Sequence, residues 1–395
     1  MWGGRMIYSQ PTDLNFCEIL EMKVDVGNLR WCSQCLTMST RPRITFDARG
    51  WCNACVWTEK KKTLDWAVRQ LELVRLLDRH RRNDGQFDCL VPVSGGKDGS
   101  YVAYSLKRKY NMNPLCVTIT PALPLPLGDQ NLRAFVESGY SHISINPDYE
   151  AMRRLNRTGF IEMGFPYYGW LISIHTAIIR IATAFGIDLI FYGEDGEVEY
   201  GGSTESSKNP IYDVRYQKKV YLEGGYEKVL AASGLTGNEL NFFCFPSDDE
   251  LDKRMLQLTH WSYFENWDPY TNYLVAKEHC GLKEAEDSSA GTFTNFSQND
   301  QALYALHTYL MYLKFGFGRA SQDACIEVRR GAMDREQAVN LVRLYDGHYP
   351  EEFIQRYLAY YQMLQPEFDA VLDRYANRDL FEKESGRWKA KFVVV

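Results

Sequence analysis

Seven consecutive residues, Ser94 to Ser100, combine the features that an anion-binding loop needs. Gly95 and Gly96 permit backbone angles that turn several N–H groups into one concavity, and a helix starting directly after them adds the positive end of its dipole. The apolar run before Ser94 is typical of a strand. The G-x-x-x-x-G-K-[ST] spacing of a Walker A loop is absent. We predict a phosphate site here; the alternative is a glycine-rich turn capped by Ser and Asp at a helix start.

Four cysteines form two C-x2-C pairs, Cys32 with Cys35 and Cys52 with Cys55, and sixteen residues separate the pairs. Two such hairpins offer four thiolates to one tetrahedral ion, which is the pattern of a four-Cys zinc ribbon. A closed shell of four thiolates leaves no position for water, so the predicted role of the zinc is structural. Redox-active C-x2-C pairs are the alternative. The remaining cysteines are scattered, which favours a reducing compartment.

A run of carboxylates follows the apolar segment Asp188–Tyr192, namely Glu194, Asp195, Glu197 and Glu199. In an open parallel sheet the ligand lies beyond the carboxyl ends of the strands, where both this run and the loop at Ser94 should emerge. We therefore expect a Mg²⁺ site or a general base at this edge, with Glu194 the preferred candidate because it is nearest the strand end. A solvated acidic loop is the alternative for any one of these residues.

The elements that must position these groups alternate between short apolar strands and amphipathic helices, which predicts crossover units and a parallel sheet covered on both faces. Strands are expected at 87–93, 115–120, 142–145 and 188–192, and helices at 99–110, 129–137, 149–163 and 171–185. Before them, Leu64, Val68, Leu71, Val74 and Leu77 recur at helical spacing over 63–82, with Thr63 as the expected N-cap.

Four regions are expected along the chain: an extension (1–27), the zinc ribbon (28–62), an α/β phosphate-loop domain (63–245) and a mostly helical C-terminal region (246–395). Beyond about residue 245 the strand signals fade, and aromatic-rich helical segments are expected at 301–314, 321–331, 335–345 and 351–364. The fold class predicted is α/β with a parallel sheet, an N-terminal four-Cys ribbon and a C-terminal helical region.

The bulk composition favours a cytoplasmic globular protein. Hydrophobic residues make up 45% and charged residues 24% of 395 residues, within the usual range for such proteins. The net charge of -6 repels a phosphate backbone, which argues against nucleic acid as the main substrate. The longest apolar stretch, 171–192, is interrupted by His175, Arg180 and Asp188, and the first residues lack the apolar core of a leader.

The pattern Ser-Gly-Gly-x-Asp-x-Ser resembles the PP-loop of the N-type ATP pyrophosphatases, a Rossmann-like group within the adenine nucleotide alpha hydrolase superfamily. The resemblance implies ATP as substrate. Ser94, Gly95, Gly96, Asp98 and Ser100 would cradle the β- and γ-phosphates, and Asp98 would also hold Mg²⁺. Lys97 stands at the position that varies among related loops. Gly99 is a departure, because many relatives have Ser there.

Several segments together resemble the N-acetyl sugar amidotransferases of the WbpG/PseA type: the ribbon, the loop at 94–100, the glutamate-rich stretch 191–202 and the segment 314–320. That family serves lipopolysaccharide O-antigen and nonulosonate biosynthesis. The resemblance implies a C–N ligase in which ATP adenylates the oxygen of a sugar N-acetyl group and ammonia replaces it, giving an acetamidino sugar. Asp98, Lys97 and Glu194 would be catalytic. Candidate substrate contacts are Tyr192, Glu197, Glu199, Lys314 and Arg319.

The resemblance also implies partners. No glutaminase nucleophile is recognisable in this sequence, so ammonia must come from elsewhere. Relatives work with a HisH-like glutaminase subunit and a HisF-like barrel subunit, and we expect such partners here, with no nucleic acid and no membrane involved.

Two other functions compete. A tRNA thiolation enzyme also combines zinc ribbons with a PP-loop, but it needs a catalytic cysteine beside the adenylate and a basic face for tRNA. Cys89 and Cys116 lie on expected strands, where cysteine is usually inert packing. A zinc-ribbon interaction module on a nucleotide-sensing domain is the third alternative.

Overall fold

The structure is a computed structural model, and it describes residues 24–203, 205–252 and 254–395. Most of the expected N-terminal extension, including Cys17, lies outside the described residues.

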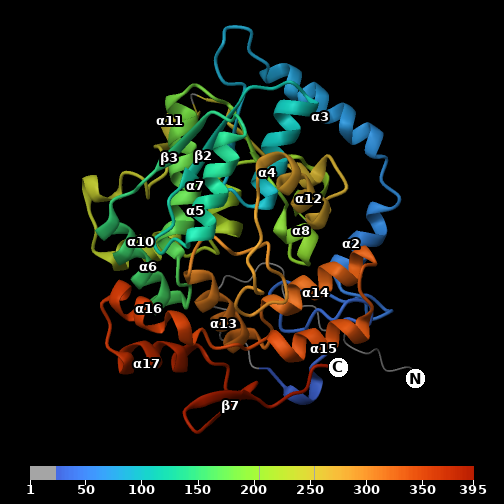
Figure 1. The fold of residues 1–395 in the computed structure, drawn as a ribbon, viewed down its shortest axis with the longest axis vertical. Helices are drawn as coiled ribbons and strands as arrows, with labels where there is room; N and C mark the ends of the chain where they lie inside the picture. Colours follow the sequence, from blue (N-terminus) through green and yellow to red (C-terminus); the bar gives the residue numbers. More distant parts are fainter. Residues whose placement is uncertain (1–23, 204, 253) are drawn as a thin grey trace.

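A six-stranded sheet, in the order β3-β2-β1-β4-β6-β5, lies in the upper half of the view in Figure 1, above the C-terminal helices. The five parallel strands are β1 (Cys89–Pro92), β2 (Pro114–Ile119), β3 (His142–Ile145), β4 (Leu189–Tyr192) and β6 (Gln257–His260). The edge strand β5 (Ile211–Tyr212) is antiparallel to β6. The predicted α/β class with a mainly parallel sheet is confirmed.

Strand β6 corrects the expectation that strands end near residue 245. Its sequence, Gln-Leu-Thr-His, contains one large apolar side chain, so it gives no apolar run. Its position in the sheet comes from parallel pairing with β4, in which Ile190 lies opposite Leu258. A strand of four residues that is positioned by pairing with a distant strand shows little of the alternation of apolar and polar residues by which strands are predicted.

Helices cover both faces of the sheet, as the alternating pattern predicts. One face packs against α6 (Tyr149–Met163), α7 (Tyr168–Ala184) and α10 (Tyr226–Ser233). The other packs against α3 (Trp66–His80), α4 (Lys97–Tyr104), α5 (Pro126–Glu137) and α12 (Pro269–Cys280). Successive side chains of β1 alternate between the faces, because Leu90 joins the first core whereas Cys89 and Val91 join the second.

Helix α3 exists where it is expected, but the predicted buried face is wrong in part. Leu73, Leu76 and Leu77 are buried. Val68, Leu71 and Val74 are 49%, 56% and 38% exposed. Apolar residues cover more than one face of this helix, so spacing alone does not identify the face that packs. Asp65, not Thr63, caps the helix, accepting from the backbone N–H groups of Ala67 and Val68.

The C-terminal region is helical, as expected, and it ends in a hairpin. It contains α13 (Leu303–Phe315), α14 (Arg319–Arg330), α15 (Arg335–Tyr345), α16 (Ile354–Tyr361), α17 (Gln365–Tyr375), β7 (Phe381–Glu384) and β8 (Arg387–Ala390). Helices α13, α16 and α17 share one core. The helix expected at 351–364 is shorter, because α16 ends at Tyr361 and the φ of its C-cap residue Gln362 is +51°.

The short elements connect these layers. They are η1 (Val26–Asn28), α2 (Asn53–Lys61), η2 (Ser105–Lys109), α8 (Gly196–Tyr200), η3 (Glu205–Lys208), α9 (Val214–Tyr216), η4 (Gln217–Tyr221), η5 (Gly237–Leu240), α11 (Asp248–Asp252), η6 (Trp261–Tyr263) and η7 (Glu351–Phe353). Within the described ranges, no helix is both long enough and apolar enough to span a lipid bilayer.

The cysteine-rich unit packs against the C-terminal region. Cys32, Cys35, Cys52 and Cys55 share a buried core with side chains of α14 and α15. Figure 1 shows the N-terminal blue segment beside these two orange helices. Segments nearly 300 residues apart therefore form one unit, as the 290-residue separation between Cys325 and Cys35 illustrates.

Candidate active site

The phosphate loop connects β1 to α4 at the carboxyl edge of the sheet. Gly95 has a φ of +78°, and a Cβ atom there would lie 2.4 Å from the backbone nitrogen of Leu132 in α5. Because backbone cannot yield as a flexible side chain can, only glycine fits this position. The loop therefore lies directly on α5, and α4 begins at Lys97 with Gly96 as its N-cap.

Most of the predicted loop residues face a cavity of about 330 Å³. Its lining includes Ser94, Gly96, Lys97, Asp98 and Gly99. Gly95 and Ser100 are not part of that lining. The side chain of Ser100 is fully buried inside α4, and its carbonyl oxygen accepts a contact from Cys280 Sγ at 3.9 Å.

Asp98 is held by one neighbour on each side. Lys97 Nζ pairs with its Oδ2, and Asn272 of α12 donates to its Oδ1 at 3.1 Å. The carboxylate therefore has a fixed orientation at the start of α4. Sequence reasoning missed Asn272, because a lone asparagine 174 positions away carries no local signal.

Glu194 follows β4 and lines the same cavity. Tyr200 donates a hydrogen bond of 3.1 Å to its Oε1. Burial raises the pKa of Glu194, and the negative charge of Asp98 adds to the rise. A cation bound between Glu194 and Asp98, beside a phosphate loop, would stabilise the charged form of Glu194, and paired carboxylates suit a divalent ion.

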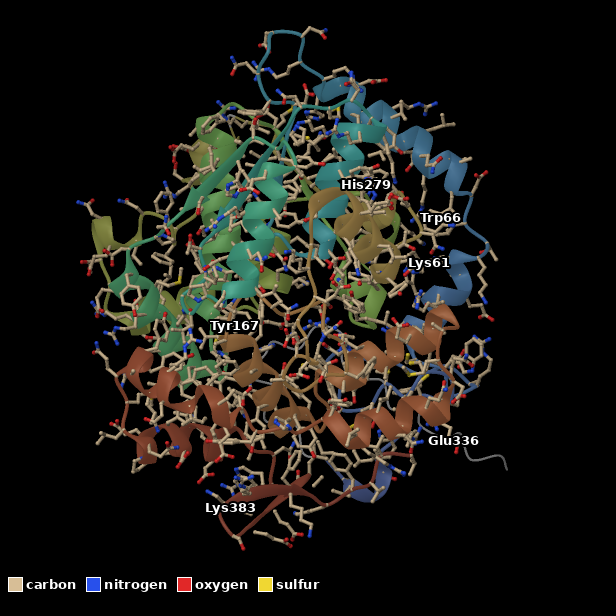
Figure 2. The ribbon with its side chains drawn as sticks, in the orientation of Figure 1. Lys61, Trp66, Tyr167, His279, Glu336 and Lys383 are labelled. Atoms are coloured by element: carbon tan, nitrogen blue, oxygen red, sulfur yellow. The ribbon has the colours of Figure 1, made fainter. Side chains whose placement is uncertain are left out.

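The other carboxylates of this run bind protein groups instead. Glu197 forms a two-pronged ion pair with Arg43, at 2.7 and 2.9 Å. Glu199 accepts from Lys61 Nζ at 2.7 Å and from Trp57 Nε1 at 2.9 Å. Lys61, labelled in Figure 2, thus joins α2 to α8. Only Glu194 of the four lines the cavity, and the other three tie α8 and the cysteine-rich unit to the sheet domain.

Asp195 caps α8 and belongs to a buried polar cluster. Its Oδ1 accepts from the backbone N–H of Glu197 at 3.1 Å, and Tyr221 donates to the same oxygen at 3.3 Å. Tyr192 lies in this cluster rather than on the cavity wall: its ring packs beside His175 and His260, and its hydroxyl accepts from Gln217 at 3.2 Å.

Helix α14 forms the opposite wall of the cavity, where Arg319 is the first residue. Its Nε donates to Asp323 Oδ1 at 2.9 Å, and Thr292 donates to the other oxygen of Asp323 at 2.6 Å. Burial opposes the charge of Arg319, but Asp323 and Glu194 outweigh it and its pKa is raised. The structure thus brings Arg319 to the same cavity as the phosphate loop.

Lys314, the other basic candidate of this segment, lies elsewhere. It is buried, and its Nζ donates to the carbonyl oxygens of Met163 and Gly164 at 2.8 and 2.7 Å. These are carbonyls at the C-terminal end of α6, which a lysine satisfies well. Lys314 is not among the residues that line the cavity.

Aromatic and amide side chains complete the cavity. Tyr167, labelled in Figure 2, meets Tyr304 edge-on with ring centroids 5.2 Å apart. The aromatic lining residues are Tyr167, Tyr200, Tyr270, Phe296 and Tyr304, and the amide ones are Asn131, Gln298, Asn299 and Gln322. Aromatic faces mixed with amides are suited to a ligand that has apolar ring faces and hydroxyl groups.

A second cavity, of about 200 Å³, adjoins the first where β1 and β2 end. Its walls are mainly apolar and include Val117, Ile119, Trp170, Ile174 and Ile178. Ser94, Gly99, Gly128 and Asp300 line both cavities. The phosphate loop therefore lies between a polar compartment and an apolar one.

The four predicted metal-ligating cysteines converge. Their sulfur atoms lie within 4.8 Å of one another, and all four residues are buried. Cys35 Sγ lies 3.6 Å from Cys52 Sγ, and Arg329 of α14 donates to Cys35 Sγ at 3.5 Å. Four converging sulfur donors without an oxygen ligand suit a tetrahedral soft ion, and the buried four-cysteine cluster is consistent with structural zinc.

The other described cysteines stay away from both cavities. Cys89 and Cys116 are buried on β1 and β2. Burial raises the pKa of the Cys116 thiol to about 12 and that of Cys89 well above its ordinary value. A thiol in such surroundings is a poor nucleophile. None of the cysteines that the structure describes lines either cavity.

Comparison with known proteins bears on the wall that carries Arg319. Residues 290–393 match the family described as "LPS biosynthesis protein WbpG-like, C-terminal domain". The matched segment contains α13 to α17 and the residues of α14 that face the phosphate loop. The resemblance to WbpG-type proteins is thereby confirmed for this C-terminal segment.

A second similarity is shorter. The chain is 30% identical over 89 residues to an uncharacterized protein of Methanocaldococcus jannaschii. The similar stretch covers 22% of this chain and 32% of that protein, so the chain spans about a third of the length of this relative.

Proposed function

We propose that this chain, whose residues 290–393 belong to the C-terminal domain family of WbpG-like LPS biosynthesis proteins, is an AMP-forming amidotransferase. In this proposal it converts the N-acetyl group of a sugar into an acetamidino group at the expense of ATP. The product would enter a bacterial surface polysaccharide such as O-antigen, or a nonulosonate.

One observation carries the proposal. The phosphate loop and helix α14 of the WbpG-like segment line the same cavity, from opposite sides. A loop suited to nucleotide phosphates and a wall suited to a sugar thus share one space of about 330 Å³. A protein that only senses nucleotides, which is the alternative of a zinc-ribbon interaction module, does not need a sugar-binding wall opposite the phosphate loop.

Each end of ATP has a suitable compartment. Ser94, Gly96 and Lys97 would hold the phosphates at the start of α4, where the helix dipole and the backbone N–H groups favour negative charge. The apolar cavity beside β1 and β2 would take the nucleoside. Asp98 and Glu194 would hold Mg²⁺, which supplies positive charge to the phosphate oxygens when it is bound.

The first cavity supports an N-acetylated sugar as the acceptor. The rings of Tyr167, Tyr270 and Phe296 offer faces for stacking on a sugar, and Gln298 and Asn299 offer amide partners for hydroxyl or N-acetyl groups. Arg319, with its pKa raised, supplies a fixed positive charge for an anionic group such as a nucleotide phosphate.

The reaction needs activation because an amide oxygen is a very poor leaving group. Attack of that oxygen on the α-phosphorus of ATP forms the new O–P bond, and pyrophosphate leaves. Ammonia then adds to the carbon, and AMP departs with the oxygen. Positioning and charge stabilisation by the loop would supply most of the rate enhancement. We further propose that a HisH-like glutaminase supplies the ammonia, with a HisF-like barrel subunit as the second partner.

The structure offers little support for tRNA thiolation. That reaction needs a cysteine nucleophile beside the adenylate, and none of the described cysteines lines either cavity. The net charge of -6 is also unfavourable for a tRNA-binding surface.

The proposal is tested by product analysis of the purified chain. The chain is incubated with ATP, Mg²⁺, ammonium chloride and a panel of N-acetylated sugar nucleotides: UDP-N-acetylglucosamine, UDP-N-acetylgalactosamine and CMP-N-acetylneuraminate. AMP, pyrophosphate and a sugar product lighter by about one dalton are expected with at least one of them. Formation of ADP, or no sugar-dependent AMP with the whole panel, overturns the proposal.

A further inference from the structure

Four residues form the boundary between the two cavities, and one of them can exchange a proton. Ser94, Gly99, Gly128 and Asp300 line both cavities. Asp300 alone among them has an ionisable side chain. It lies within the WbpG-like segment, whereas the other three belong to the sheet domain. The C-terminal region therefore brings a carboxyl group to the edge of the phosphate loop.

The backbone of Asp300 is fixed against the first turn of α5. Leu125 donates its backbone N–H to the carbonyl oxygen of Asp300 at 3.0 Å, and Pro124 bridges to Gln301. A Cβ atom on Gly128 would lie 2.3 Å from Cα of Asp300, so the lack of a side chain at Gly128 permits this approach. Within the described part of the chain, the side chain of Asp300 has one hydrogen-bond partner from another residue, the hydroxyl of Tyr304 at 3.5 Å.

The boundary is where the reacting atoms must meet, an argument that rests on the proposed function. With phosphates on the loop, nucleoside in the apolar cavity and sugar in the polar one, the bond between acceptor oxygen and α-phosphorus forms between the cavities. Ammonia then adds to the carbon next to that oxygen. The adduct carries a positive charge on the new nitrogen, so a base must remove a proton before AMP can leave cleanly.

We propose that Asp300 is this general base. The lone pair of ammonia forms the C–N bond while the π pair of the protonated imidate C=N bond moves onto the acetamido nitrogen, and the carboxylate of Asp300 takes one proton from the resulting ammonium nitrogen. The electron pair on nitrogen then expels the AMP oxygen as the C–O bond breaks, leaving an amidinium group and AMP. Asp300 returns its proton to solvent before the next turnover.

The surroundings of Asp300 fit this role. Burial raises its pKa to about 6, so it is mostly ionised at neutral pH yet a better base than an ordinary aspartate. The titratable groups around it are Tyr304 and Tyr167, with Asp129 of α5 lining the apolar cavity and Arg319 the polar one, and α5 presents backbone at Gly128. Both tyrosines stay neutral at physiological pH because burial raises their pKa values.

The test separates the two half-reactions in the Asp300→Asn variant. Adenylation is measured as sugar-dependent exchange of labelled pyrophosphate into ATP, with the sugar nucleotide of the panel that supports AMP formation. Amidine formation is measured by mass spectrometry with ammonium chloride, at a constant free ammonia concentration at each pH. The matched control is Asp287→Asn, which removes an exposed carboxylate thirteen residues earlier in the chain.

We expect Asp300→Asn to retain pyrophosphate exchange within about threefold and to lose amidine formation by about 10²- to 10⁴-fold. In the wild type, amidine formation should rise as the pH increases through about 6, and this limb should be missing in the variant. The control should match the wild type in both assays. Retained exchange also shows that the variant is folded.

A failure of this inference and a failure of the proposed function give different results. Amidine formation by Asp300→Asn at the wild-type rate overturns the role of Asp300 and leaves the proposed function intact. Loss of both half-reactions also overturns it, because Asp300 would then be needed for adenylation. Absence of sugar-dependent exchange in the wild type overturns the proposed function itself.

Discussion

The side-chain nitrogen of Asn272 in α12 lies 3.1 Å from Oδ1 of Asp98 at the start of α4. Lys97 binds the other oxygen of the same carboxylate, so both oxygens of Asp98 are held before any ligand arrives. Helix α12 follows the sixth strand of the chain, far from the loop in sequence, and packs along α4. The orientation of the proposed Mg²⁺ ligand thus depends on a helix that no local motif connects with the phosphate loop.

Substitution Asn272→Ala should lower kcat/KM for ATP by roughly 10- to 100-fold, because a hydrogen bond to a charged group is lost. Steady-state pyrophosphate release measures the effect. Asn238→Ala, an exposed asparagine on η5, serves as the control and should leave the rate unchanged. Equal rates for Asn272→Ala and wild type would show that Asp98 needs no support from α12.

Gly95 and Gly85 form a matched pair, since their φ values are +78° and +79°. A methyl group on Gly95 meets the backbone of Leu132 at 2.4 Å, whereas nothing lies within 4 Å of the corresponding position on Gly85. Gly85→Ala should therefore cost only the backbone strain, about 1–2 kcal/mol in the free energy of unfolding. Gly95→Ala should cost more and abolish ATP binding, as measured by urea unfolding and calorimetry. Equal costs would contradict the close packing of the loop on α5.

The buried pair of Lys61 and Glu199 should act on stability rather than on substrate binding. Glu199→Gln leaves the ammonium of Lys61 buried without its counter-charge, which should destabilise the fold by about 3–5 kcal/mol. The KM values for ATP and sugar should not change. Glu59→Gln, which breaks an exposed pair with Arg49, should leave the unfolding midpoint nearly unaltered. A raised KM for the sugar in Glu199→Gln would instead indicate that Glu199 contacts the substrate.

Zinc should be present at one equivalent per chain, bound by the four-cysteine cluster. Cys52→Ser should lose the metal and lower the thermal midpoint, since the cluster shares its core with α14 and α15. Metal analysis by mass spectrometry and thermal unfolding measure these outcomes, and Cys244→Ser outside the cluster should keep its zinc. A content below half an equivalent in the wild type would contradict the assignment.

Arg319 and Lys314 should behave differently although both were candidate sugar contacts. Arg319→Met removes a charge from the cavity wall and should raise the KM for the sugar nucleotide at least tenfold with little change in the KM for ATP. Lys314→Met removes two hydrogen bonds at the end of α6 and should lower stability while both KM values stay the same. A reversed pattern would place Lys314, not Arg319, at the sugar.

Sequence alone determined the parts that depend on local spacing. The alternation of strands and helices predicted the parallel sheet, and the paired cysteines predicted the cluster that the structure brings within 4.8 Å. The loop at Ser94 was recognisable because its glycines, strand and helix are contiguous. Each of these signals lies within a few tens of residues and reflects backbone geometry or ligand spacing.

Only the tertiary structure decided which side chains share the cavity. The four carboxylates after β4 look alike in sequence, yet Arg43, Lys61 and Trp57 bind Glu197 and Glu199 and leave Glu194 facing the phosphate loop. Asn272, Asp300 and Arg319 reach the loop from segments about 170 to 220 residues away. Such contacts arise when whole helices and strands pack together. Contacts between residues so far apart in the sequence produce no local periodicity or residue spacing from which they could be predicted.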